Sequence, residues 1–307
     1  MFEKTLYLDM PDGTRLAYHL EPAALSARGI LLICHGLTEH SLRYNAFAKA
    51  MSAAGFHVYA HDHRGHGQTT APDASLGRFA QKDGVAKVIA DVKAMRDFAS
   101  AAHPDLPVLL FGHSMGGLIA LRATTEYPES FNALAVWNSN FNAGFAGHIA
   151  RIVLKIERAL KGSDVPSLIM AKSTFEAWGK SIPNHRTAFD WLSRDAQEVD
   201  LYIADPLCGF PVSVSLWLDL MELTLNTATL ERLSALPKTL PVHLVGGGQD
   251  PATAKAEAIR WLSGRMAQSG LRHVRLKIYP DMRHETLNEI GREKAIDDFI
   301  AWATAAV

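Results

Sequence analysis

The sequence predicts an α/β fold built on a mostly parallel sheet. Between residues 29 and 137, strand-length apolar runs alternate with segments of helical periodicity, the pattern of parallel strands joined by crossover helices. The run at residues 29–34 is apolar throughout, which predicts a strand buried on both faces. Another apolar run, residues 108–111, passes through Gly112-His113-Ser114-Met115-Gly116 into a helix-length segment, which predicts a sharp strand-to-helix turn.

The order of elements begins with an antiparallel hairpin, because Pro11-Asp12-Gly13 separates two strand-like runs. The eight strands are predicted at residues 5–8, 15–20, 29–34, 57–60, 108–111, 131–137, 241–245 and 274–279. Helices are predicted at residues 44–54, 84–101, 118 to about 127, 214–236, 253–269 and 291–305. The alternation stops between Asn138 and Pro211, where only helical pieces and polar breaks occur.

We therefore expect one open sheet with helices on both faces and a helical cap inserted after the sixth strand. The expected boundaries are residues 1–138 and 212–307 for the core and residues 139–211 for the cap.

The overall composition excludes several classes of protein. The 31 basic and 32 acidic residues nearly cancel, so no nucleic-acid partner is expected. The two cysteines, Cys34 and Cys208, lie far apart in the sequence and form no disulfide framework. The start of the chain lacks the layout of a signal peptide, and no apolar stretch reaches the ~18 residues of a membrane span. A cytoplasmic protein is expected.

The turn at residues 112–116 has the G-x-S-x-G form of a nucleophile elbow, which makes Ser114 a candidate nucleophile. The alternative is an ordinary glycine-containing strand–helix turn. A serine hydroxyl needs a base that takes its proton and an acid that orients the base. The loops after the last two predicted strands carry Asp250 and His284, in the Ser-Asp-His order of a hydrolase triad. Asp281 is the alternative acid, and Asp250 is favoured because it arrives from a separate strand end.

An oxyanion needs two backbone donors, and the N–H groups of Leu37 and Met115 are placed to supply them. Gly36 allows the loop backbone to approach an ester. The run from His61 to His66 resembles a metal motif, but Gly65 replaces the aspartate that the motif needs. We therefore expect neither a metal nor a cofactor.

Several segments resemble α/β-hydrolases of the monoacylglycerol lipase and lysophospholipase group. They are residues 35–40 with Arg43 and Tyr44, residues 60–68, 112–117, 249–251 and 283–289. The resemblance covers both core segments and is weak across residues 141–211. It implies the α/β-hydrolase fold, the triad Ser114, Asp250 and His284, and the oxyanion donors Leu37 and Met115. It also implies that Glu39 and Arg43 lie near the polar head of the ester.

Within the cap, residues 147–160 form an amphipathic pattern with an apolar stripe and a basic remainder. One interpretation is a helix packed on the core with a solvated basic face. The other is a roof whose inner face lines an acyl tunnel and whose basic face makes transient contact with a membrane surface. On the second interpretation, Ile149, Ile152, Trp217 and Leu218 contact the substrate.

The predicted function is therefore a cofactor-independent serine ester hydrolase that acts on a monoacyl, amphiphilic lipid. Three alternatives use the same triad: a small-ester hydrolase, a thioesterase and an acyltransferase. A fourth alternative, from a different class, is a non-catalytic hydrolase-like binding protein.

Overall fold

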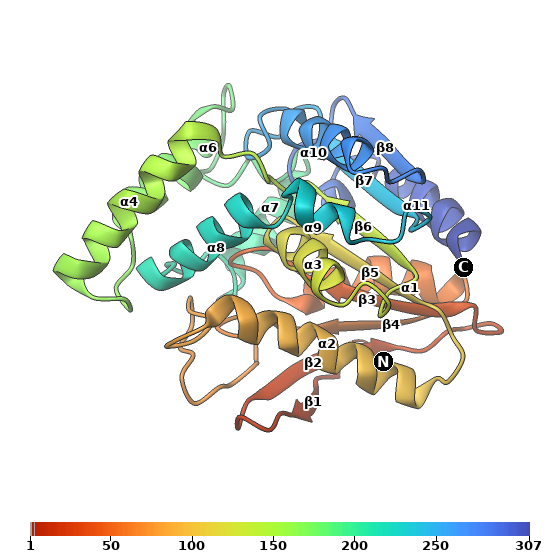
Figure 1. Cartoon of the computed structure of the whole chain (residues 1–307). Helices are drawn as coiled ribbons and strands as arrows, with labels where there is room; N and C mark the ends of the chain where they lie inside the picture. Colours follow the sequence, from red (N-terminus) through yellow and green to blue (C-terminus); the bar gives the residue numbers. More distant parts are fainter. Residues whose placement is uncertain (1, 3) are drawn as a thin grey trace.

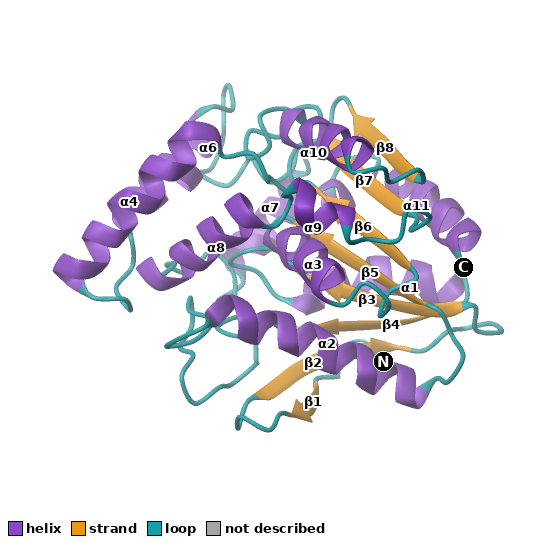
Figure 2. Cartoon of the chain, in the orientation of Figure 1, coloured by secondary structure: helices purple, strands orange, loops and turns teal. Residues whose placement is uncertain are grey.

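The computed structural model describes residue 2 and residues 4–307. Eight strands form one sheet in the order β1-β2-β4-β3-β5-β6-β7-β8 (Figures 1 and 2). The strands are β1 (Leu6–Asp9), β2 (Arg15–Glu21), β3 (Gly29–Cys34), β4 (Phe56–His61), β5 (Val108–His113), β6 (Ala133–Trp137), β7 (Val242–Gly247) and β8 (Val274–Tyr279). β2 pairs antiparallel with β1 and β4, and every pair from β4 to β8 is parallel. The predicted eight-stranded, mostly parallel sheet is confirmed.

Helices cover both faces of the sheet (Figure 2). One face carries α1 (Asn45–Ala53), preceded by η1 (Ser41–Tyr44), and α11 (Arg292–Ala306). The other face carries α2 (Gly84–Ala102), α3 (Met115–Glu126), α8 (Val214–Asn226), α9 (Leu230–Ser234) and α10 (Glu257–Gln268). Strands β3, β5 and β6 are buried along their whole length, as their uninterrupted apolar sequences require.

Two predicted helices differ in extent from the observed ones. The helix expected at residues 214–236 is divided into α8 and α9, because Thr229 caps a new helix by accepting a hydrogen bond from the Arg232 N–H. The helix expected at residues 253–269 begins only at Glu257, because Ala254, Lys255 and Ala256 all have positive φ angles.

Residues 138–213, all of them described, form helices and loops and add no strand to the sheet. The helices are α4 (Gly144–Lys161), α5 (Leu168–Ala171), the π-helical turn η2 (Lys172–Glu176), α6 (Ala177–Lys180) and α7 (Ala196–Ala204). α4 packs on α8 and lies at the left of Figure 1, away from the sheet. In the described residues, no helix is both long and apolar enough to cross a membrane.

The predicted orientation of α4 is wrong. Its buried residues are Gly147, Leu154 and Glu157, whereas Ile149 and Ile152 are 47% and 58% exposed. The Glu157 carboxylate accepts a hydrogen bond of 2.6 Å from the Ser167 hydroxyl, which fixes this polar residue on the inner side. The apolar stripe therefore faces outward.

Histidines inside the core are held in their neutral form. His35, His61, His66 and His243 are all buried. Burial lowers the pKa of His35 to about 4 and the pKa of His61, of His66 and of His243 to about 3. Protonation of these rings is therefore coupled to unfolding.

We expect the free energy of unfolding to fall as the pH falls below about 6.5, the ordinary histidine pKa. Below this pH the histidines of the unfolded chain bind protons, whereas the same histidines stay neutral in the folded chain. His61→Asn removes one such group and should reduce the slope of stability against pH by up to about 1.4 kcal/mol per pH unit. Urea unfolding at several pH values between 6.5 and 4 measures this slope. His148→Asn, at an exposed position on α4, is the control, and equal slopes for both variants would contradict the prediction.

Candidate active site

A strained turn between β5 and α3 carries Ser114. Its backbone angles, φ 54° and ψ −119°, lie where residues with a side chain are rare. A Cβ atom on Gly112 would collide with the Gly116 carbonyl, and one on Gly116 would collide with the Cys34 carbonyl of β3. Only glycine fits at both positions, so the turn places Ser114 at the carboxyl edge of the sheet.

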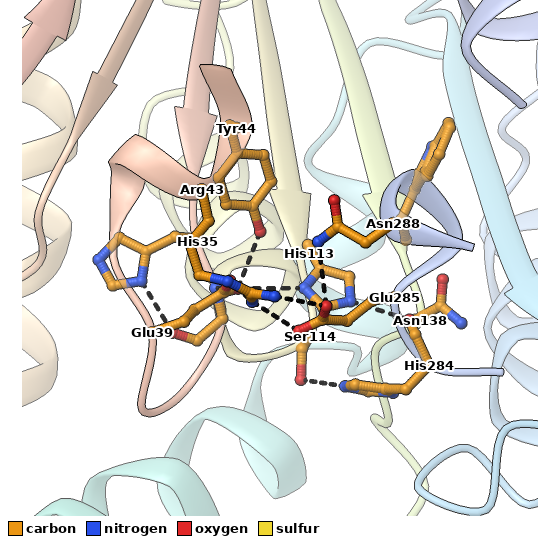
Figure 3. Close-up of polar contacts among 12 residues, drawn as sticks. His35, Glu39, Arg43, Tyr44, His113, Ser114, Asn138, His284, Glu285 and Asn288 are labelled. Atoms are coloured by element: carbon orange, nitrogen blue, oxygen red, sulfur yellow. Dashed lines mark hydrogen bonds and ion pairs between the residues drawn. The ribbon is translucent and has the colours of Figure 1, made fainter. Parts of the chain in front are cut away.

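Ser114, His284 and Asp250 form one chain of hydrogen bonds. Ser114 Oγ lies 2.9 Å from His284 Nε2 (Figure 3), and His284 Nδ1 lies 2.9 Å from Asp250 Oδ2. Because an ionised carboxylate only accepts, Nδ1 carries the proton and Nε2 is free to accept from the serine hydroxyl. The three residues follow β5, β8 and β7, whose ends meet at one edge of the sheet.

The Asp250 carboxylate is fully buried and accepts three further hydrogen bonds. They come from Asn138 Nδ2 at 3.1 Å, Thr253 Oγ1 at 2.7 Å and the Ala252 N–H at 2.9 Å. Burial by itself raises the pKa of this carboxyl, but His284, with Thr253 and Asn138, outweighs burial and lowers the pKa below its ordinary value. Asp281, the alternative acid, is exposed to solvent.

The two predicted oxyanion donors lie beside Ser114. Met115 is the first residue of α3, so its N–H has no partner within the helix. Leu37 follows β3, and both residues line the same cavity as Ser114. A Cβ on the adjacent Gly36 would lie 2.6 Å from Glu39 Oε1, which explains the need for glycine in this loop.

A buried cluster of charged groups lies behind this loop (Figure 3). Arg43 forms a bidentate pair with Glu285, with N–O distances of 2.6 and 2.7 Å, and donates to Glu39 at 2.7 Å. Glu39 Oε1 also accepts from the Gly36 N–H at 2.5 Å and from the Tyr44 hydroxyl at 2.9 Å. Every charged group of the cluster therefore has a partner of opposite charge.

His113 connects this cluster to the histidine loop. Its Nδ1 lies 3.3 Å from Glu39 Oε1, and its Nε2 lies 3.0 Å from the His284 carbonyl oxygen. Burial disfavours a charge on His113, but Glu39 and then Glu285 outweigh burial and raise its pKa. Both contacted oxygens are acceptors, so this environment suits a ring whose two nitrogens both donate.

Ser114 lines a cavity of about 210 Å³. Most of its wall is apolar, from Met170, Phe175, Trp178, Trp191, Trp217, Leu220 and Met221. Its polar lining residues include Glu39, His113, Tyr202 and Glu285.

Only some of the residues predicted to contact substrate lie at the cavity. Gly36, Glu39 and Trp217 line the cavity that contains Ser114. Arg43 lies behind Glu39 and lines a small adjoining cavity. Leu218 is outside the lining and packs against the core. Ile149 and Ile152 lie on the outer side of α4, so the structure does not bring them to the cavity.

Among the described residues, one group of possible metal ligands is close together: His40, Asp205 and Cys208, with ligand atoms within 4.8 Å of one another. His40 Nε2 and Asp205 Oδ2 are already bonded to each other at 2.8 Å. Burial raises the pKa of the Cys208 thiol. A neutral thiol next to a satisfied His–Asp pair is a poor donor set for a cation.

The sequence analysis missed two residues that hold Asp250. Asn138 directly follows β6, at the same sheet edge as the other site residues, and that position was the available signal. Thr253 lies three residues after Asp250, but many threonines occur in such turns, and spacing alone does not distinguish this one.

The fold and the site define an α/β-hydrolase whose Ser-His-Asp chain opens into an apolar cavity. The chain belongs to the serine aminopeptidase S33 family (Hydrolase_4), whose family model matches residues 26–291. The protein is a hydrolase of the esterase and lipase class.

Similar proteins cover nearly the whole chain. A monoacylglycerol lipase from Mycolicibacterium smegmatis is 29% identical over 293 residues, which are 94% of this chain and 93% of the relative. Human monoglyceride lipase is 28% identical over 93% of this chain and 90% of its own length. The crystal structure of a thermostable carboxyl esterase from Bacillus coagulans, in complex with glycerol, superposes with a TM-score of 0.88 at 26% identity and 99% coverage of both chains.

Proposed function

We propose that this protein hydrolyses monoacyl lipid esters, with Ser114, His284 and Asp250 as its catalytic triad. The observation that carries the proposal is the chain of two 2.9 Å hydrogen bonds that ends in an apolar cavity. The names of the relatives support it, since they include monoacylglycerol lipases and a Bacillus subtilis phospholipase that is 26% identical over 86% of this chain.

In the proposed reaction, Ser114 Oγ attacks the ester carbonyl carbon while His284 Nε2 takes the hydroxyl proton. Asp250 stabilises the imidazolium, and the N–H groups of Leu37 and Met115 donate to the oxyanion. His284 then gives the proton to the leaving alcohol, and the acyl group remains on Ser114. A water molecule, deprotonated by His284, attacks the acyl-enzyme carbonyl. The bond to Ser114 Oγ then breaks, His284 returns the proton to Oγ, and the carboxylic acid is released.

The acyl chain lies along α8 in this proposal. Trp217, Leu220, Met221 and Thr224 line the cavity at the spacing of one helix face. From Trp217 to Thr224 this face extends about 10 Å at about 1.5 Å per residue. Such a wall suits one acyl chain of medium length. The alcohol then faces Glu39, His113 and Tyr202, whose polar groups suit a hydroxylated head group.

The outward stripe of α4 is the proposed contact with a lipid surface. Phe145, Ile149, Ile152, Ile156 and Leu160 are all exposed on this helix, by 47% to 80%. Basic residues accompany them at positions 151, 155, 158 and 161, and the buried Glu157 is the only carboxylate of the helix. Apolar residues flanked by cations suit the interface of an anionic bilayer.

The triad assignment predicts that Ser114→Ala abolishes ester hydrolysis and that Asp250→Asn lowers kcat by about 10⁴-fold, because an amide does not hold the required tautomer. Asp281→Asn should retain nearly full activity. Hydrolysis rates and labelling of Ser114 by a fluorophosphonate probe measure these effects. Loss of activity in Asp281→Asn with retention in Asp250→Asn would show that the acid is misassigned.

The cavity predicts the chain-length preference. With dispersed monomeric esters, kcat/KM should rise about fourfold per methylene, from about 0.8 kcal/mol each, until the cavity is full. Met221→Glu places a charge on this wall and should reduce the rise. Ile149→Glu, on the outer face of α4, should leave it unchanged. A profile that is highest for acetate would favour a small-ester hydrolase.

The surface of α4 predicts binding to vesicles. Wild-type protein should sediment with vesicles of phosphatidylglycerol, and Ile152→Glu combined with Ile156→Glu should prevent this while hydrolysis of a monomeric short ester continues. Leu25→Glu is the control, because Leu25 is 66% exposed in the loop before β3. Equal sedimentation of wild type and the α4 variant would contradict the proposal.

A further inference from the structure

One part of the cap is bonded to the loop that carries His284. Residues 190–195 of the cap run beside residues 283–290. Hydrogen bonds from the backbone and from side chains join the two segments. The His284 N–H donates to the Trp191 carbonyl at 3.4 Å, and the Glu285 N–H donates to the Leu192 carbonyl at 2.7 Å. Arg283 Nη1 donates to the Asp190 carbonyl at 2.6 Å and to the Ser193 carbonyl at 3.1 Å. Cap residues thus hold His284 and Glu285 by their backbone N–H groups and Arg283 by its side chain.

Glu289 is the centre of this arrangement. It is fully buried, and its Oε1 accepts from the Arg283 N–H at 2.8 Å and from the Arg194 N–H at 3.1 Å. Its Oε2 accepts from Arg194 Nε at 2.9 Å and from the Ile290 N–H at 2.9 Å. One carboxylate therefore joins the residue before His284 to the cap, and Arg194 supplies the positive charge that its burial requires.

The same cap segment covers the imidazole ring. The Trp191 ring lies over His284, with ring centroids 4.9 Å apart, and both residues line the cavity. The ring and backbone of His284 are therefore both in contact with a segment that is distant in sequence from the histidine loop.

We propose that Arg194 and Glu289 are a positioning pair for His284, so that cap residues 190–195 function as part of the catalytic loop. The inference rests on the proposed function, since it assigns the pair a role in the reaction of His284. If the pair is lost, the loop is free to move, and the 2.9 Å contacts of His284 with Ser114 and Asp250 are made only part of the time. A displacement of about 1 Å in a reacting group costs up to about 10²-fold in rate.

The test compares Glu289→Gln, Arg194→Met, their combination and Arg194→Lys. Arg186→Met is the matched control, because Arg186 is a half-exposed cap arginine that pairs with Asp200 at 2.7 Å. We expect kcat to fall at least tenfold in both single variants, by the same factor for short and long esters, with little change in KM. The combined variant should lose no more than either single one, because both remove one interaction. Arg194→Lys should recover part of the rate, and Arg186→Met should resemble wild type.

Two readouts separate positioning from stability alone. The acid limb of the kcat/KM profile should move to lower pH in the combined variant, which loses one acid and one base and so keeps the net charge of the protein, because a displaced imidazole lies farther from Asp250. Amide hydrogen exchange of residues 283–289 should be faster in Glu289→Gln and Arg194→Met and unchanged in Arg186→Met. A lower Tm with unchanged kcat and pH profile, or unchanged exchange, would overturn the proposal. Exchange requires no turnover, so failure of wild type to cleave any ester would reject the proposed function while the effect of the Arg194–Glu289 pair on the loop is still measured.

Discussion

The close approach of β5, α3 and β3 at Ser114 is the constraint on which the rest of the site depends. A positive φ at a serine costs about 1–3 kcal/mol and persists only where its surroundings determine it. Here the Ser114 N–H donates to the Trp137 carbonyl of β6 at 2.9 Å, and the Ser139 hydroxyl donates to the Ser114 carbonyl at 2.8 Å. The pairing of β5 with β6 brings both partners to Ser114, because Trp137 is the last residue of β6 and Ser139 lies two residues further on. The core of the sheet thus maintains the strained turn that exposes Ser114, the proposed nucleophile.

Buried charge is the second organising interaction. Glu39 and Arg43 follow β3, Glu285 follows β8, and His113 is the last residue of β5. The charged groups among them need one another, because a buried charge that loses its partner costs about 3–5 kcal/mol. A displacement of any one of these loops would leave such a charge unpaired. The loop after β3 that carries Glu39, the turn at Ser114 and the loop after β8 that carries His284 therefore have one favourable arrangement relative to one another.

The sequence predicted the sheet, the elbow and the three residues Ser114, Asp250 and His284, because each depends on local order along the chain. An apolar run, a glycine-flanked serine and polar residues after successive strands are all visible within about ten residues. The Arg43–Glu285 pair spans 242 positions and the Arg194–Glu289 pair spans 95, and neither has a local signal. Such pairs form only where two distant loops lie side by side. The order of the strands in the folded sheet determines which loops do so, and this order cannot be read from a short stretch of sequence.

The orientation of α4 was predicted wrongly for a related reason. Periodicity identifies an apolar side and a polar side, but the neighbouring element decides which side is inward. Here the neighbour is α8, and Ser167 holds Glu157 between them. The next helix, α5, also has apolar residues on its outer side: Leu168 and Ile169 are exposed, while Met170 lines the cavity. This short helix therefore has an exposed apolar side, and its other side forms part of the cavity wall, so α5 separates the exterior of the cap from the cavity by one helix.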